Sequence, residues 1–184
     1  MEKSIKKALS NYELLKMIKH KSNLLTYENL MHYENIDDIL KDGSCIILYE
    51  NRNKIGHWVC VFKNDIEIDI STNPPTVSKV KPYIEYFNSY GYKPDEEIAL
   101  IDPYIRKKQG ITYPHLTYLL WKSGLPISYN EHKLQKSLPG INTCGRWCAA
   151  RLILKNIKLE QFVKLWRGTL PKDAQVTLFT KYLE

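Results

Sequence analysis

The stretch "SCIILYENRNKIGHWVCVFK", Ser44–Lys63, decides the fold class, because the period of the sequence changes there. "SCIILYE" and "GHWVCVFK" are short apolar runs with β-strand composition, and the polar "NRNKI" between them is typical of a hairpin turn. We expect a second turn at Lys63–Asp65, after which "IEIDI" alternates as a third strand. "STNPPTVSKVKP" has paired prolines and no periodic pattern, which indicates a loop, and "YIEYFNSYG" returns to a strand that ends by Gly91.

The sequence on both sides of these strands has helical patterns. Before them we expect a helix from Lys3 to Lys21 and two short helical pieces, "TYENLMHY" and "NIDDILKD". After them "HLTYLLWKSG" is helical, with its glycine as the C-cap, and "LPISYNEHKLQ" is extended. Thr143 is a suitable N-cap for a helix through about Asn156, and two more helices are expected at 159–166 and 173–183.

Helices, then strands, then helices favour an α+β fold with a mainly antiparallel or mixed sheet packed against a central helix. A length of 184 residues fits a single domain, 1–184, with a helical N-terminal part (1–42), a core (43–156) and C-terminal helices (157–184). The N-terminal "MEKSIKKALSNYELLKMIKHK" is basic and amphipathic and lacks the continuous apolar core of a secretory signal. We therefore expect it to be a helix of the mature chain.

Composition and charge narrow the class of protein. No apolar run approaches the roughly 18 residues of a membrane span, so we expect no membrane partner. Four irregularly spaced cysteines favour free thiols and an intracellular, non-secreted protein. The net charge of +7 leaves nucleic acid open as a partner, although the lysines are spread along the chain and solubility explains them more simply. We expect a monomer.

The densest basic stretch and the thirteen tyrosines each have a simple explanation and a functional alternative. We interpret "RKKQG", which contains Arg106–Lys108, first as a solvated turn and second as a nucleic-acid or substrate contact. Most tyrosines are spaced as core or half-buried surface residues rather than as a stacking platform for bases.

The purpose of Cys144 and Cys148 in "NTCGRWCAARLILKN" is the central question of the sequence. A structural zinc site would also need Cys45 and Cys60, which have no knuckle spacing, and a disulfide within one helical turn has awkward geometry. We expect Cys148 and Cys60 to be packed core thiols. Cys144 differs, because it lies at the first turn of a helix, where unpaired N–H groups and the helix dipole favour a thiolate.

Two neighbours of Cys144 in the sequence fit acyl-transfer chemistry. Gly145 leaves the backbone uncovered, so that a substrate carbonyl can approach it closely. Gln135, nine residues upstream, carries a side-chain N–H that is suited to binding an oxyanion. Among five histidines, His57 is the candidate general base, because it opens a strand beside Trp58 and packing there would hold the ring rigidly.

These residues, in this order, resemble the cysteine proteases grouped around the adenovirus maturation protease, which are related in fold to the SUMO-deconjugating proteases. The resemblance rests on "GHW" (His57, Trp58), "YFNSYG" (Asn88), "KLQ" (Gln135) and "TCGRWC" (Cys144), and it covers roughly residues 45–155. It implies an adenain-like cysteine-protease fold, in which the nucleophilic cysteine stands at the N-terminus of the central helix.

The resemblance also implies a role for each matched residue. Cys144 would attack the carbonyl, and His57 would take the thiol proton and later protonate the leaving amine. Asn88 would orient the imidazole, while Gln135 and the Cys144 backbone N–H would bind the oxyanion. Trp58 resembles the family's ring beside the catalytic pair, and we assign Trp58 and Gly145 to substrate binding. No metal or other cofactor is implied.

The third catalytic residue departs from the family pattern, in which Asp or Glu is frequent. Asn88 can accept the imidazole N–H, but it lacks the charge that would stabilise an imidazolium. Asp69 in "EIDIS" is the alternative, only twelve residues after His57. We favour Asn88, because "FNSYG" matches the strand end of the family.

Three functions follow, in order of preference. The first is a viral cysteine endopeptidase that hydrolyses peptide bonds in protein precursors during virion maturation. The second is an isopeptidase that removes ubiquitin or SUMO, which uses the same machinery. The third is a non-catalytic basic module that binds nucleic acid.

Overall fold

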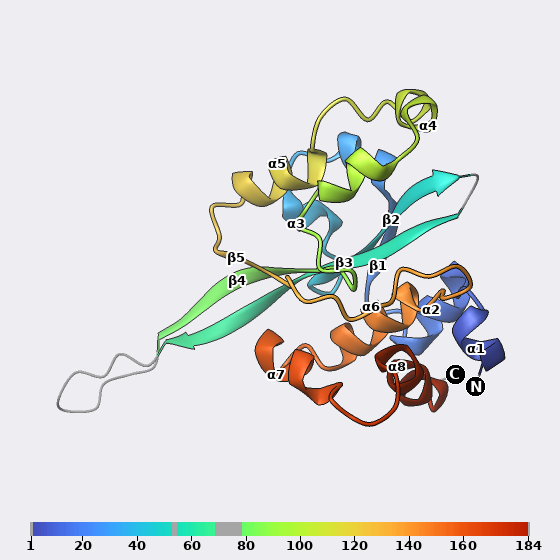
Figure 1. Ribbon diagram of the computed structural model, residues 1–184. Helices are drawn as coiled ribbons and strands as arrows, with labels where there is room; N and C mark the ends of the chain where they lie inside the picture. The colour runs from blue at the N-terminus through green and yellow to red at the C-terminus, as the bar shows by residue number, and fades with distance from the viewer. Residues whose placement is uncertain (1, 53–54, 69–78, 184) are drawn as a thin grey trace, which may run out of the picture.

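The computed structural model describes residues 2–52, 55–68 and 79–183, and its centre is a five-stranded sheet in the order β1-β2-β3-β4-β5 (Figure 1). The strands are β1 (Asn23–Thr26), β2 (Ser44–Arg52), β3 (Ile55–Ile68), β4 (Lys79–Phe87) and β5 (Ile127–Tyr129). The two outer pairs are parallel and the two inner pairs antiparallel, so the sheet is mixed. The predicted α+β class is confirmed.

Helices cover both faces of the sheet, which therefore forms the middle of three layers (Figure 1). On one face lie the 3-10 helices η1 (Tyr27–His32) and η2 (Glu96–Leu100) with α3 (Ile36–Ile39), α4 (Pro103–Lys108) and α5 (His115–Lys122). On the other lie α1 (Glu2–Lys6), α2 (Asn11–Met17), α6 (Cys144–Ile153), α7 (Leu159–Leu165) and α8 (Lys172–Lys181). Continuous apolar runs such as "CIIL" are typical of strands that are buried on both faces.

Alternation along β2 divides the core into two clusters. Ile46 and Leu48 face α6, while Cys45 and Ile47 face the helices of the opposite layer. Cys60 and Cys148 belong to the α6 side and are fully buried, which confirms that both are core thiols. The four free cysteines are thus distributed over both faces of the sheet, and the described residues contain no group of three or more side chains that could hold a metal.

An ion pair inside the core fixes α6 to the sheet. The Arg151 guanidinium donates to both carboxylate oxygens of Glu85 on β4, at 2.6 and 2.8 Å, and neither side chain is exposed. Arg151 also donates to the carbonyls of Leu154 and Ile157 and packs against Phe62. A buried charge is tolerated when it is paired and hydrogen-bonded in this way.

The turn predicted at Lys63–Asp65 is wrong, because β3 continues through these residues to Ile68 while paired with β4. The Asn64 side chain donates to the Tyr83 hydroxyl and to the Lys155 carbonyl, so a polar residue is satisfied within an extended strand. "IEIDI" is therefore not a separate strand over its described part; it continues β3. The predicted loop at 71–82 lies outside the described residues up to 78, and its last four residues belong to β4.

The N-terminal prediction was wrong in detail. The expected single helix is two helices, and the second begins at a capping box in which Ser10 and Glu13 bond each other's backbone N–H groups. β1 was missed, as were η2 and α4; Arg106–Lys108 form the last turn of α4 rather than a loop turn. Gly124, with φ of +65°, follows α5 as predicted, and α6 ends at Ile153, before the expected Asn156.

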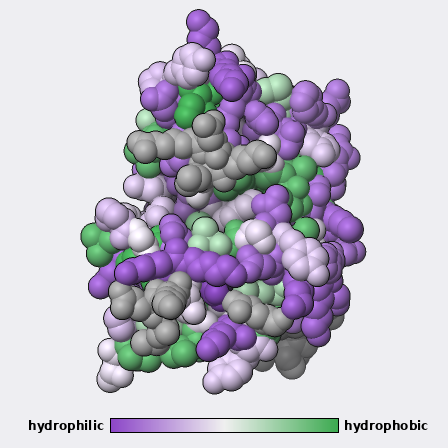
Figure 2. Space-filling model, turned by 90° about the vertical axis from the view of Figure 1, so that its right-hand side faces the viewer, coloured by the Kyte–Doolittle hydropathy of each residue, from purple (hydrophilic) through white to green (hydrophobic). Residues whose placement is uncertain are grey.

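None of the helices in the described part of the chain is long and apolar enough to span a membrane. The face drawn in Figure 2 is largely hydrophilic, and its hydrophobic residues gather in smaller groups between the polar ones.

Candidate active site

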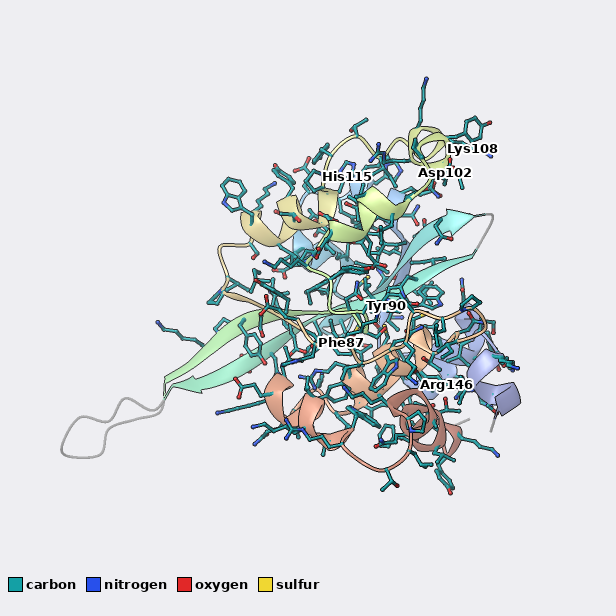
Figure 3. All side chains as sticks on the ribbon, in the orientation of Figure 1. Phe87, Tyr90, Asp102, Lys108, His115 and Arg146 are labelled. Carbon is teal, nitrogen blue, oxygen red and sulfur yellow. The ribbon has the colours of Figure 1, made fainter. Side chains whose placement is uncertain are left out.

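A pocket of about 270 Å³ opens where the sheet meets the start of α6. Its walls include His57 from β3, Tyr90 from the turn after β4, Glu97 from η2, Gln135 and Cys144. Three of the four predicted catalytic residues therefore line one cavity, although 87 residues separate His57 from Cys144 in the sequence. Tyr90 lies near the centre of the molecule, close to the sheet and α6 (Figure 3).

Cys144 is the first residue of α6, as predicted, and is half-buried at the pocket wall. Thr143 occupies the N-cap position, but its side chain makes no cap hydrogen bond; its hydroxyl donates to Asp173 instead. The backbone N–H groups of Trp58, Gly145 and Cys144 itself lower the pKa of the thiol. The sulfur therefore lies close to the backbone of Trp58, the residue after His57.

The prediction that the helix start ionises this sulfur is wrong for the resting protein. Burial raises the pKa of Cys144 to about 11 and outweighs the three N–H groups. Desolvation penalises a thiolate more strongly than one helix end favours it. The resting group is a neutral thiol.

His57 lies on β3 opposite Tyr49 of β2 and is 7% exposed. Gly56 permits this placement, because a Cβ at that position would lie 2.0 Å from the Tyr49 carbonyl oxygen. Burial lowers the pKa of His57 to about 3, and the hydrogen bond with Asn88 opposes the shift only in part. The imidazole is consequently neutral at physiological pH and has a lone pair for accepting a proton.

Asn88 fixes which ring nitrogen carries that lone pair. Its Oδ1 accepts the Tyr90 backbone N–H at 2.9 Å, which identifies this atom as the oxygen of the amide. The same oxygen lies 3.1 Å from His57 Nε2, so Nε2 must carry the proton and donate. Nδ1 of His57 is then the basic nitrogen.

The turn after β4 holds Asn88 in place. Its side chain bonds the backbone two residues later, as asparagine commonly does in turns, and Gly91 with φ of +82° closes the turn. A Cβ at Gly91 would lie 2.8 Å from the Glu131 carbonyl oxygen, so no other residue fits. The Tyr90 ring stacks on the His57 imidazole with centroids 4.3 Å apart and planes inclined by 22°. This stacking, together with Asn88, holds the imidazole in one orientation.

Gln135 is 1% exposed, and its amide is oriented by Ser89. The Ser89 hydroxyl donates to Oε1 at 2.8 Å, which turns Nε2 towards Tyr90 OH at 3.2 Å and the Ile141 carbonyl at 3.4 Å. The Ser89 carbonyl also accepts the backbone N–H of Gln135. The predicted oxyanion donor is thus docked beside the turn that carries Asn88.

Asp173, the second residue of α8, connects the two sides of the pocket. Its carboxylate accepts from the Thr143 hydroxyl at 2.5 Å, the Trp147 indole at 3.1 Å and the Lys136 backbone N–H at 3.0 Å. It is 3% exposed. One buried carboxylate thus fixes the position of the start of α6 relative to the segment that carries Gln135.

Trp58 and Gly145, which we assigned to substrate binding, do not belong to the described lining of the pocket. Trp58 is 6% exposed in the core, and a Cβ on Gly145 would lie 3.4 Å from the Trp58 ring. Asp69, the alternative third residue, lies outside the described residues.

Sequence reasoning missed Glu97 and Tyr90. Glu97 Oε2 accepts from Asn88 Nδ2 at 2.6 Å and is 6% exposed, although "DEEIAL" suggests a solvated surface. No local pattern distinguishes Glu97 from the exposed Glu96 beside it. Tyr90 could have been suspected from its place in the Asn-Ser-Tyr-Gly turn.

Comparison with known proteins gives a relative and a structural similarity. No protein-family model matches the chain. In structure the chain is similar to a crystal structure of the ASFV pS273R protease, with a TM-score of 0.49 and 17% identity, over 98% of this chain and 69% of that one. In sequence it is 41% identical over 160 residues to the "uncharacterized protein V9" of Sputnik virophage, which covers 86% of this chain and 83% of the relative. The chain belongs to the family of this virophage protein.

Proposed function

We propose that the protein is a cysteine endopeptidase that cleaves protein precursors with Cys144 as nucleophile and His57 as base. The observation that carries this proposal is the tautomer of His57: Nε2 donates to Asn88 at 3.1 Å, which leaves Nδ1 as the base in a pocket that Cys144 also lines. A neutral thiol that lines the same pocket as an oriented, neutral imidazole is suited to nucleophilic catalysis. The motif resemblance to the adenain-like proteases supports the same roles.

The first step transfers the Cys144 proton to His57 Nδ1 while the sulfur attacks the scissile carbonyl. Because burial raises the pKa of the thiol to about 11 and lowers that of the imidazole to about 3, no ion pair is formed beforehand. Substrate binding must therefore supply part of the driving force for proton transfer. The new S–C bond gives a tetrahedral intermediate with a negative oxygen.

That oxygen would be bound by Gln135 Nε2 and the Cys144 backbone N–H. Gln135 Nε2 now donates weakly to Ile141 O, at 3.4 Å, and this bond can be exchanged for the oxyanion. The imidazolium then gives its Nδ1 proton to the leaving amine, which breaks the C–N bond and leaves a thioester on Cys144. Water, deprotonated by His57, hydrolyses the thioester and restores the thiol.

The virophage origin of the relative supports a viral setting, with cleavage in the virion or the infected cell. We propose a monomer that needs no metal or cofactor for turnover. The basic residues at the end of α4, where Lys108 lies, are well separated from Tyr90 of the pocket (Figure 3), so any contact they make with nucleic acid would be remote from the chemistry.

An active-site-directed peptidyl vinyl sulfone, mapped by mass spectrometry, tests the proposal. We expect labelling of Cys144, loss of labelling in Cys144→Ser and His57→Ala, and none at the fully buried Cys148, which serves as the internal control. Labelling that persists in His57→Ala at neutral pH would reject the catalytic pair. Cleavage of di-ubiquitin or a SUMO conjugate, with the precursor proteins of the same virus left intact, would replace the endopeptidase by an isopeptidase.

A further inference from the structure

The third residue of the catalytic group has no charge of its own. Asn88 is 0% exposed, and its carbonyl side is occupied by His57 Nε2 and the Tyr90 N–H. An amide can orient the imidazole but offers little stabilisation once the ring becomes cationic. The amide side of Asn88 points to a carboxyl group, Glu97 Oε2, at 2.6 Å.

We propose that Glu97 is a positioning residue of this site: through the Asn88 amide it fixes the tautomer of His57, and when ionised it supplies the negative charge that the third residue lacks. The inference rests on the proposed function. Glu97 lines the same pocket as His57 and Cys144, although it lies on η2.

The orienting role follows from the hydrogen bonds around Asn88. Nδ2 donates to two acceptors, Glu97 Oε2 and the Tyr86 hydroxyl at 3.2 Å, while Oδ1 accepts from two donors. Turning the amide over would place Nδ2 against the Tyr90 backbone N–H, which can only donate, and, once Glu97 is ionised, would place Oδ1 against its carboxylate. Glu97 therefore helps to keep Oδ1 towards His57.

The charge on Glu97 depends on pH. Burial raises the pKa of Glu97 to about 8, opposed by the Asn88 hydrogen bond, so the carboxyl ionises just above neutrality. The ionisable groups that face it are Tyr49 (β2), His57 (β3), Tyr86 and Tyr90 (β4 and the following turn), Glu96 (η2), and Cys144 and Cys148 (α6).

The histidine, the tyrosines and the two thiols among these neighbours do not change charge just above neutrality. Burial raises the pKa of Tyr90 to about 12 and those of Tyr49 and Tyr86 well above the usual value, so the three phenols stay neutral. A pH-dependent step near 8 in the reactivity of Cys144 can therefore be assigned to Glu97. An ionised Glu97 repels a thiolate at Cys144 and attracts an imidazolium at His57, to which it is linked through the Asn88 amide. The inference is that the attraction has the larger effect on the reactivity of Cys144.

Two substitutions together can move the carboxylate from position 97 to position 88 and keep a hydrogen bond between the two side chains. In Asn88→Asp combined with Glu97→Gln, the new glutamine amide can donate to the new aspartate, which reverses the direction of the contact. The negative charge then lies on the side chain that accepts the hydrogen bond of the His57 imidazole, as in a triad with aspartate. Glu96→Gln, on the exposed neighbour in the same 3-10 helix, is the matched control.

The test measures the rate of Cys144 alkylation by iodoacetamide from pH 6 to 10, followed by mass spectrometry, with melting temperatures as a check on folding. In the natural protein we expect a step in rate near pH 8, superimposed on the steady rise with pH of a thiol whose pKa is about 11. Glu97→Gln should lose the step and react about ten-fold more slowly above pH 8, which corresponds to one unit of imidazole basicity. The double variant should recover the rate to within about three-fold above pH 8 and show no step near pH 8. Glu96→Gln should keep the step, moved to lower pH, because the Glu96 charge contributes to raising the pKa of Glu97.

An unchanged rate and profile in Glu97→Gln would overturn the inference. So would a folded double variant that does not recover. Failure of the proposed function is recognised separately: alkylation in His57→Ala that equals the natural protein across this range would reject the catalytic pair, and the role of Glu97 with it.

Discussion

Two buried polar clusters are built around residues that lie three positions apart in the sequence. They differ in charge, because the first holds an ion pair and the second holds neutral groups. At Glu85, on β4, a carboxylate receives a bidentate guanidinium and both groups are fully buried. At Asn88, just after β4, an amide separates an imidazole from a carboxyl group, and burial keeps both of those groups uncharged at neutral pH. The first cluster anchors the last turn of α6 through Arg151. The second includes residues of the pocket that Cys144, the first residue of α6, also lines.

The comparison indicates what makes a buried polar cluster a candidate for chemistry. The Arg151–Glu85 pair is complete, and each charge has its partner. In the His57–Asn88–Glu97 chain burial shifts the pKa of both ionisable groups, to about 3 at His57 and about 8 at Glu97. Shifted pKa values of this kind, next to a pocket, are typical of active sites.

The largest effect is expected on stability, when one partner of the Arg151–Glu85 ion pair is removed. Arg151→Ala leaves Glu85 buried without a partner, and we expect a loss of about 3–5 kcal/mol in the free energy of unfolding. Urea denaturation at pH 7 measures it, with the exposed Arg167→Ala as control. A loss below about 1 kcal/mol would show that water or another group replaces the guanidinium.

Next in size is the loss of the oxyanion donor. Gln135→Ala should lower the rate of peptide cleavage by about 10²–10³ and leave weak activity, because one donor to the developing charge is lost. Ser89→Ala, which removes only the group that orients the glutamine, should give a smaller loss in the same direction. Equal rates in Gln135→Ala and the natural protein would exclude this residue from the reaction.

The third prediction concerns pH. The pKa of Glu97 is about 8 in the folded protein against 4.5 in an unperturbed carboxyl, so between these values the folded state holds one more proton than the unfolded state. This contribution to stability is therefore lost as pH rises, by up to about 1.4 kcal/mol per pH unit, until it is gone above pH 8.

Denaturation of the natural protein and Glu97→Gln between pH 6.5 and 8.5 isolates this effect, since both proteins share the titration of His57 and it cancels in their difference. The variant should gain relative stability as pH rises. A difference that stays constant would mean that the carboxyl is ionised throughout.

The smallest effect is expected at Cys148. This thiol donates to the Trp58 carbonyl at 3.3 Å in the core, and Cys148→Ala should cost about 1–2 kcal/mol of stability. Alkylation of Cys144 and cleavage of peptides should remain within about two-fold. A complete loss of activity in a folded Cys148→Ala protein would move the chemistry from Cys144 to Cys148.

Local patterns predicted the elements that carry the site. The β2–β3 hairpin, the helix that starts at Cys144 and the turn at Asn88 all have signals within a few residues. The capping box of Ser10 and Glu13 was also visible as S-x-x-E, and attention to it would have divided the N-terminal helix correctly.

The remaining features depend on contacts between distant residues. Asn64 stays in an extended strand because Lys155, 91 residues away, accepts its amide. The state of Cys144 was predicted from the helix start alone, but burial by other elements outweighs it. Glu97 becomes part of the site only through the packing of η2 against Asn88, which no spacing rule contains.

The contacts of Asp173 determine when, during synthesis of the chain, the site can form. Synthesis proceeds from the N-terminus, so α8 leaves the ribosome after Gln135 and after α6. Until it does, Thr143, Trp147 and Lys136 have no carboxylate to join them, and Cys144 and Gln135 are not held in fixed relative positions. On the proposed function, the site would become competent for cleavage only after α8 has been made and has packed against α6.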